Sequence, residues 1–220
     1  MTGRRPHDSI RTMGSAAAIV GKKLRTGWRL VTRDPGGLLK LVRFEPYVVF
    51  SALATDIPSR PAPEGVTVRR LTRADVEALL PLDQDVRDGM KRCGAMADEA
   101  VFAAFYRGAF AHLSWLITAD RDRERMTPRL VRLRRHEAEI THCVTLPEFR
   151  GRQIYPYVIS YLFDVARSRS IREIFMVTKH DNIASQKGIL KAGLTRRRGR
   201  VYLLRILHAY ATFRTFRCWR

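Results

Sequence analysis

Residues 137–167 read EAEITHCVTLPEFRGRQIYPYVISYLFDVAR, and this stretch decides the fold. Its first nine residues alternate as in a strand, which places on one face Glu137, Glu139, Thr141, Cys143 and Thr145. A turn containing Gly151 follows, and from Ile154 the apolar residues recur at helical spacing. The stretch therefore predicts a strand, a tight turn and a helix in direct succession.

The turn in this stretch is a candidate anion site. A strand that feeds a tight, Gly-containing turn and then a helix presents unpaired backbone N–H groups, and the helix dipole adds positive potential at the same point. Pro156 stands near the first helical turn, where its missing N–H removes no hydrogen bond. Arg150 and Arg152 add charge that matches phosphate. Many such turns bind nothing, so the turn alone is weak evidence.

Together with a second motif, this turn resembles the acetyl-CoA site of the GNAT superfamily of N-acetyltransferases. Residues 147–154 (PEFRGRQI) are similar to that superfamily's Arg/Gln-x-x-Gly-x-Gly/Ala core. Residues 182–185 (NIAS) and 191–194 (KAGL) are similar to its second signature, an Asn that opens a helix ending in Lys-x-Gly-Phe. The resemblance covers residues 64–207. It implies an α/β fold with a central mixed β-sheet, helices on both faces, and acetyl-CoA or another acyl-CoA as the bound substrate.

The resemblance also implies a set of site residues. The backbone of Cys143 and Thr145 would pair with the pantetheine arm as an extra strand does. Asn182 and Ser185 would hydrogen-bond the cofactor, although an N-cap and a first-turn residue also have a structural role open to them. The predicted cofactor site comprises Cys143, Thr145, Arg150, Gly151, Arg152, Gln153, Ile154, Tyr155, Asn182 and Ser185. No metal is expected.

Three positions depart from the family pattern. Gln153 stands where the motif usually has Gly, and Tyr155 stands where it has Gly or Ala. Because a Gln at positive φ is strained, we expect a helical or bridge conformation at Gln153. Tyr155 is expected either to narrow the approach of the pyrophosphate or to lean over the acyl pocket. Ile189 occupies the place of the family's frequent Tyr acid, so the general acid is unassigned.

Acyl transfer from a thioester to an amine needs a base for the ammonium group, donors for the oxyanion, and a proton for the thiolate. Glu139 is the candidate base, because its strand segment is similar to the one that holds the base in histone-acetylating members. Glu137 and His142 are the runners-up. The alternative for Glu139 is a solvated or salt-bridged residue. His142 is expected on the opposite face, where the alternative is a core histidine with its hydrogen bonds satisfied. Cys143 lacks an adjacent base on its strand face and is discounted as a nucleophile.

Charge and proline spacing divide the chain near Pro61. Residues 1–60 carry 11 Lys and Arg against 4 Asp and Glu, whereas residues 61–140 carry 14 against 13 and residues 141–220 carry 16 against 4. Three prolines within six residues are typical of a linker: Pro58, Pro61 and Pro63. We expect a basic N-terminal extension over residues 1–60 and a GNAT acyltransferase domain over residues 61–220.

From Val66 onward strand and helix signals alternate. Strands are expected at Val66–Leu71, Phe110–Ala119, Ile174–Val177 and Val201–Ile206, with a hairpin partner at Leu130–Arg134. Helices are expected after the capping box of Thr72 and Asp75, over Asp98–Arg107, and over Ile183–Ala192. The acceptor pocket is expected from residues 83–107 and the C-terminal strands.

Three classes of function remain for this sequence, which carries a net charge of +20. The first is an enzyme that acylates a small amine or amino sugar, and the second is a protein or peptide N-acyltransferase that docks on an acidic or membrane-bound partner. The third, a nucleic-acid-binding module, is suggested by charge alone, and the sequence has no zinc ligands, ribonucleoprotein-type aromatic motif or helix-turn-helix. Nucleic acid is therefore not an expected partner.

Cysteine usage and apolar run lengths indicate a cytoplasmic protein. The three cysteines have no paired spacing, and no run approaches the roughly 18 apolar residues of a membrane span. The basic stretch Ile10–Val31 is a candidate helix for peripheral attachment to an anionic membrane.

Overall fold

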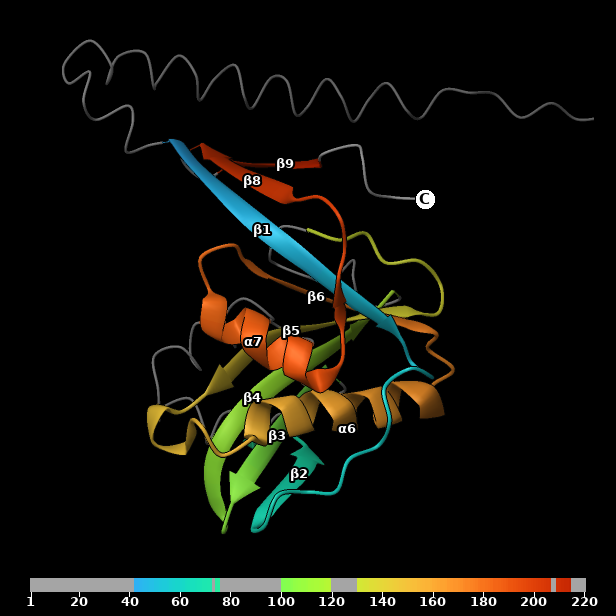
Figure 1. Ribbon diagram of the computed structural model, residues 1–220, viewed down its shortest axis with the longest axis vertical. Coiled ribbons are helices and arrows are strands. Elements are labelled where there is room, and N and C mark those ends of the chain that lie inside the picture. The colour runs from blue at the N-terminus through green and yellow to red at the C-terminus, as the bar shows by residue number, and fades with distance from the viewer. Residues whose placement is uncertain (1–41, 73, 76–99, 120–129, 207–208, 215–220) are drawn as a thin grey trace, which may run out of the picture. The chain divides into compact units, whose positions relative to one another are not determined.

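The computed structural model describes residues 42–72, 74–75, 100–119, 130–206 and 209–214. A mixed β-sheet runs in the order β2-β3-β4-β5-β6-β1-β8-β9, and β7 pairs with β1 (Figure 1). The strands are β1 Val42–Leu53, β2 Val66–Arg70, β3 Val101–Tyr106, β4 Ala109–Thr118, β5 Glu137–Thr145, β6 Glu173–Lys179, β7 Thr195–Arg196, β8 Val201–Ile206 and β9 Ala209–Arg214. The helices are η3 Pro147–Phe149, α6 Ile154–Ser168 and α7 Ile183–Ala192.

The chain divides into two compact units. The larger comprises Glu45–Leu203 with Tyr210–Arg220, and the smaller comprises Met1–Phe44 with Leu204–Ala209. Of the smaller unit, only strand residues are described. The candidate site lies in the larger unit.

The type of strand pairing changes once along the path from β2 to β6. β2 to β5 form an antiparallel meander, and β5 then pairs with β6 in parallel. A parallel pair needs a crossover connection, which α6 provides. The predicted mixed α/β sheet is confirmed.

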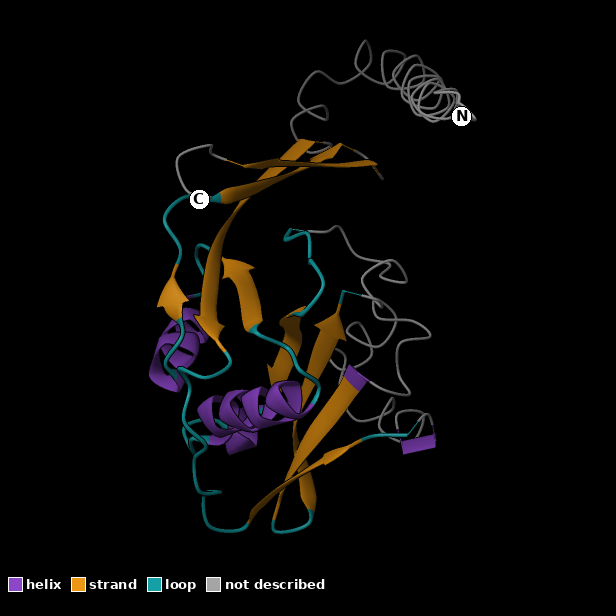
Figure 2. Ribbon diagram, turned by 90° about the vertical axis from the view of Figure 1, so that its right-hand side faces the viewer, coloured by secondary structure: helices purple, strands orange, loops and turns teal. Residues whose placement is uncertain are grey.

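Both long helices described pack on one face of the sheet (Figure 2). Their core includes Ile140 of β5, Val158 of α6 and Ile189 of α7, all buried. The opposite face carries a second core around Trp115, to which Leu71 belongs. None of the described helices combines the length and apolar character needed to cross a bilayer.

The predicted helix start after β2 is confirmed. The backbone N–H of Thr72 donates to the Asp75 carboxylate at 2.9 Å, and the N–H of Asp75 donates to Thr72 Oγ1 at 3.2 Å. This reciprocal pair is a capping box. The helix beyond Asp75 lies outside the described residues.

Two predicted elements are wrong. Residues 101–106 form strand β3, not part of a helix over Asp98–Arg107, because Val101 and Ala103 pack in one core while Phe102 and Ala104 pack in the other. A strand buried on both faces produces the same adjacent apolar pairs as one helix face. Residues 130–134 form no strand, and the ladder neighbours of β5 are β4 and β6.

β1 brings part of the expected N-terminal extension into the sheet. Its residues Tyr47–Leu53 pair with β6, and Val48 and Phe50 are fully buried. The larger unit starts at Glu45, so residues 45–60 belong to it. The expected basic helix Ile10–Val31 lies outside the described residues.

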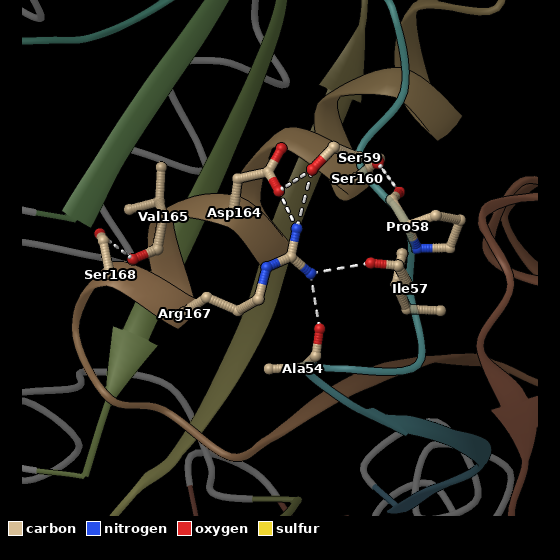
Figure 3. A network of polar contacts seen from close by, with 9 residues as sticks. All are labelled: Ala54, Ile57, Pro58, Ser59, Ser160, Asp164, Val165, Arg167 and Ser168. Atoms are coloured by element: carbon tan, nitrogen blue, oxygen red, sulfur yellow. Dashed lines mark hydrogen bonds and ion pairs between the residues drawn. The ribbon is translucent and has the colours of Figure 1, made fainter.

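The segment after β1 is tied to α6 by Arg167 (Figure 3). Its Nη1 donates to the carbonyl oxygens of Ala54 at 2.6 Å and of Ile57 at 2.8 Å. Its Nη2 donates to Ser59 Oγ at 3.0 Å and pairs with the Asp164 carboxylate. The proline-rich segment is thereby fixed to the helix that precedes β6.

Candidate functional site

β5 carries a bulge at its centre. Its register with β4 passes from Thr141↔Trp115 to Val144↔Leu113, so two residues of β5 oppose one residue of β4. One of the two, His142, has a φ of +49°. Such a bulge bends the strand and shifts the alternation of side chains beyond it.

The bulge changes which side chains share a face. Ala138 before the bulge and Cys143 within it both pack toward α6, so Glu139 lies on the opposite face from Cys143. The predicted common face for Glu139 and Cys143 is therefore wrong. His142 packs edge-on against Trp115, with ring centroids 5.8 Å apart, in the core that faces away from α6. The prediction that His142 faces away from Glu139 is wrong for the same reason.

Beyond the bulge, β5 and β6 separate. Their ladder runs from Glu137↔Glu173 to Ile140↔Met176, although β5 continues to Thr145 and β6 to Lys179. Parallel strands that part in this way leave the backbone edge of β5 open toward β6 among the described residues. An extended ligand can add to such an edge as a strand.

The open edge leads into a cleft of about 580 Å³. The cleft is lined by β5, the turn after it, the start of α6, and α7. Of the predicted cofactor-binding residues, the cleft is lined by Cys143, Thr145, Arg150, Gly151, Gln153, Ile154, Tyr155, Asn182 and Ser185. Arg152 does not line it, since its guanidinium lies over the Tyr106 ring, 4.7 Å from the centroid.

Two lysines of α7 also line the cleft, and neither was predicted. Lys187 and Lys191 lie four residues apart, so they share one face of the helix. That spacing was the signal in the sequence. No acidic residue is among the described residues that line the cleft.

The turn after β5 lines this basic cleft. Gly151 and Gln153 both have left-handed backbone, with φ of +81° and +64°. In the described residues, the N–H groups of residues 151–153 donate to no backbone carbonyl. α6 has no acidic residue in its first turn and no side-chain cap. Its N-terminus therefore keeps a positive potential for an anion.

No family model matches the sequence, and no curated protein matches it. Solved structures do resemble it. A GNAT-family protein from Novosphingobium aromaticivorans is 18% identical with a TM-score of 0.50, over 74% of this chain and 64% of that one. A GNAT-family acetyltransferase from Colwellia psychrerythraea is 14% identical with a TM-score of 0.53, over 75% and 57%. A glucosamine N-acetyltransferase region of a fungal β-N-acetylglucosaminidase is 11% identical with a TM-score of 0.57, over 86% and 23%.

The fold is that of the GNAT superfamily. This confirms the resemblance drawn from the two sequence motifs. The chain spans less than two thirds of the length of each of these neighbours. At these identities the likeness concerns the fold, because unrelated activities share folds.

Gln153 occupies a GNAT glycine position in a glycine-like conformation. It is the N-cap of α6 with φ +64° and ψ +9°, so the expected helical or bridge conformation is wrong. The left-handed region costs a residue with a Cβ about 1–2 kcal/mol. The turn imposes this conformation because the chain reverses direction within three residues, between Arg150 and the first helical residue.

Tyr155, also a departure from the GNAT pattern, leans toward β5 and α7. Its hydroxyl is 3.3 Å from Ser185 Oγ, and its ring centroid is 5.6 Å from that of His112 on β4. Gly188 of α7 makes room for the ring, because a Cβ at that position would lie 2.5 Å from it. Tyr155 therefore fills the space between the two helices next to Cys143.

A chain of polar side chains lies behind Tyr155. His112 Nδ1 is 2.7 Å from Thr145 Oγ1, and its Nε2 is 2.7 Å from Ser114 Oγ. The Cys143 thiol donates to the carbonyl oxygen of Thr141 at 3.7 Å, and the hydroxyls of Ser114 and Tyr155 lie near enough to affect its pKa. Burial lowers the pKa of His112 to about 3, so the imidazole is neutral and donates through one nitrogen only.

Cys143 and Tyr155 both keep their protons at neutral pH. Burial raises the pKa of the Cys143 thiol to about 12. Burial, followed by the neighbouring Cys143, raises the pKa of Tyr155 well above its ordinary value. Because the thiolate is the nucleophilic form of cysteine, this environment disfavours Cys143 as a nucleophile.

Two predicted ligands make structural hydrogen bonds. Asn182 Oδ1 accepts from the N–H of Ser185 at 3.0 Å, which caps α7. Arg150 Nε donates to the carbonyl oxygen of Thr145 at 3.1 Å, which joins the turn to β5. Both side chains still line the cleft.

The candidate bases occupy different environments. Glu139 is 3% exposed on the face of β5 away from α6. Glu137 accepts a hydrogen bond from the N–H of Arg134 at 2.7 Å, and this contact closes the turn before β5. At the position of the frequent GNAT tyrosine, Ile189 is 1% exposed in the core beneath α7.

Proposed function

We propose that this protein is an N-acyltransferase that moves an acetyl or longer acyl group from acyl-CoA to an amine by direct transfer. The observation that carries the proposal is the open edge of β5 that leads into a basic cleft at the N-terminus of α6. This arrangement suits a long ligand with a pyrophosphate at one end and an extended, amide-containing arm at the other.

The cleft fits such a ligand in charge and in hydrogen bonding. The turn offers backbone N–H groups, and three cations line its walls: Arg150, Lys187 and Lys191. Phosphate groups are stabilised by both features. The edge of β5 beyond Ile140 offers donors and acceptors to the amides of the arm. When bound, acyl-CoA supplies the activated thioester carbonyl.

The acceptor amine is proposed to approach from the other face of the sheet. Glu139 lies there, and we propose that it takes the proton of the amine, with His142 as the alternative base. The ladder between β5 and β6 ends at Ile140. The acyl donor and the acceptor are proposed to meet beyond this point, each held on its own side of the sheet.

A small amine or amino sugar is the proposed acceptor. One structural neighbour, the fungal region described above, is a glucosamine N-acetyltransferase, which supports this class at the level of the fold. A protein or peptide acceptor is the second candidate, and the basic residues 141–220 favour an acidic partner for it. A cytoplasmic location and membrane attachment through residues 10–31 belong to the same proposal.

Calorimetry and enzyme assays test the function in sequence. Acetyl-CoA should bind the wild-type chain, and the double variant Lys187→Glu, Lys191→Glu should bind at least tenfold more weakly, a loss of about 1.4 kcal/mol or more. The double variant Arg132→Glu, Arg135→Glu, at exposed positions outside the cleft, is the matched charge control and should bind like wild type. An amine panel with detection of free thiol then identifies the acceptor. A well-folded chain that binds no acyl-CoA contradicts the proposal.

A further inference from the structure

The polar chain between the sheet and the two helices ends at the cleft. His112 Nε2 lies 2.7 Å from Ser114 Oγ, and the His112 ring lies 5.6 Å, between centroids, from the ring of Tyr155, which lines the cleft beside Cys143. Binding an anion at the turn requires none of these groups. Because these polar groups surround the Tyr155 hydroxyl, that hydroxyl is a candidate proton donor at the cleft.

We propose that Tyr155 donates the proton that the departing thiolate sulfur takes up during acyl transfer. This role rests on the proposed function, since it assigns a catalytic residue to that reaction. It places the acid on α6, while the corresponding GNAT position on α7 holds the buried Ile189.

The geometry favours Tyr155 over the other donors that line the cleft. Lys187 and Lys191 are exposed, so their charges remain in solvent. The Cys143 thiol is a weak hydrogen-bond donor. The Tyr155 hydroxyl projects from the first turn of α6 to a point between Cys143 on β5 and Ser185 on α7. Gly188 holds the ring in this direction because it leaves the space that the ring occupies.

The surroundings change the pKa of the Tyr155 hydroxyl and that of the thiol it would form in the same direction. In water a phenol with a pKa of about 10 gives up its proton reluctantly to a thiolate whose acid has a pKa of about 8.5. Here burial raises the pKa of the neighbouring Cys143 thiol to about 12. A thiolate released beside Cys143 loses solvation in the same way, so its affinity for the proton rises along with that of Tyr155.

The step balances in atoms and electrons. The amine nitrogen forms a bond to the carbonyl carbon, the carbon–sulfur bond breaks, and its electron pair stays on sulfur. The hydroxyl proton of Tyr155 moves to that sulfur, and the proton of the amine goes to the base on the other face. Tyr155 recovers a proton from water through the hydroxyl of Ser185, which is half-buried in the cleft wall. The products are an amide and a free thiol.

Tyr155→Phe tests the assignment. Tyr157→Phe, two residues further along α6, is the matched control. Tyr155→Phe should bind acetyl-CoA within about twofold of wild type and lose about 10²- to 10⁴-fold in kcat. Tyr157→Phe should retain full kcat. A Tyr155→Phe variant with the kcat of Tyr157→Phe overturns the proposal.

A second measurement needs no turnover. In protein with ¹³Cζ-labelled tyrosine, CoA should shift the Tyr155 resonance, which Tyr155→Phe identifies, while CoA lacking its sulfur should bind and leave that resonance in place. Equal shifts from both ligands overturn the assignment of Tyr155 but leave the proposed function intact. Failure of both ligands to bind contradicts the proposed function itself. If Tyr155→Phe does not fold, Ser185→Ala identifies the resonance instead, because it removes the hydroxyl next to Tyr155.

Discussion

At the level of single residues, the turn before α6 depends on left-handed backbone at Gly151. Its φ is +81°, and a Cβ added there would meet no atom within 4 Å. The cost of any side chain at this position is therefore a backbone cost. Gly108 is a close match, with φ +83° and equally open surroundings, but it lies in the turn between β3 and β4.

Gly151→Val and Gly108→Val should each lower the free energy of unfolding by about 1–2 kcal/mol, because both force a Cβ into the left-handed region. Only Gly151→Val should also weaken acetyl-CoA binding, since only that turn lines the cleft. Urea unfolding and calorimetry measure the two effects separately. Equal losses of affinity in both variants would show that the turn has no special role in binding.

Glu139→Gln tests the proposed base. It keeps the shape of the side chain and removes the carboxylate, so kcat should fall about 10²- to 10⁴-fold with acyl-CoA affinity unchanged. The loss should shrink at high pH, where more of the acceptor amine is already neutral. Glu137→Gln and His142→Ala are the controls on the same strand. If Glu139→Gln keeps full activity and one control is inactive, the base is the residue that is changed in that control.

His112 should make the fold sensitive to acid. Burial lowers its pKa to about 3, so between about pH 3 and 6.5 the unfolded chain binds a proton there that the folded chain does not. Stability should therefore be fully present above pH 6.5 and fall, on the order of a few kcal/mol, as the pH drops toward 3. Urea unfolding across this range measures the slope, which His112→Asn should flatten.

Asp75 is a separate contribution to that profile. Its hydrogen bond with the Arg69 guanidinium holds the pKa of the carboxyl below its usual range, so this effect is lost only below about pH 4. Asp75→Asn should leave the slope between pH 4.5 and 6.5 as it is in wild type. A flattened slope in Asp75→Asn would mean that the acid sensitivity does not come from His112.

At the level of elements, the two ends of α6 have different roles. Its first turn lies at the cleft, and its last turn carries Arg167, which fixes the segment after β1 through the carbonyls of Ala54 and Ile57 (Figure 3). This contact sets the position of a helix whose N-terminus binds the anion in the proposed function. The bulge in β5 has a similar role in the sheet. The ladder between β5 and β6 ends next to the bulge, which leaves the edge of β5 open toward β6.

Arg167→Ala should lower the free energy of unfolding by about 1.5–3 kcal/mol, because it removes charged hydrogen bonds and leaves two carbonyls without their donor. Arg169→Ala, exposed just after the end of the same helix, is the control and should change stability by less than about 0.5 kcal/mol. Urea midpoints measure both. Similar midpoints for the two variants would mean that the Arg167 contacts do not stabilise the fold.

At the level of the whole molecule, the larger unit begins within β1, at Glu45. Removing residues 1–41 should leave folding and acetyl-CoA binding intact, while removing residues 1–60 should prevent folding, because β1 lies between β6 and β8 in the sheet. In the proposed attachment, the shorter truncation should also lose binding to anionic vesicles, at about 1 kcal/mol for each basic residue near the leaflet. Vesicle sedimentation measures this loss. Retained binding would move the contact to another basic surface.

Local sequence was sufficient for the turn of residues 147–154 and for the α6 and α7 helices, because backbone propensity, Gly placement and apolar spacing act within a few residues. The mixed sheet and most residues that line the cleft were predicted from the resemblance of two motifs to the GNAT superfamily. Tertiary structure alone decided that residues 101–106 form a strand, that β1 enters the sheet, and that Gln153 adopts a left-handed conformation. It also decided that Glu139 and Cys143 lie on opposite faces and that Tyr155 rests against Gly188. A bulge and a pairing register arise from contacts between distant segments, and one inserted residue reverses every face beyond it, so neither can be derived from periodicity within a single strand.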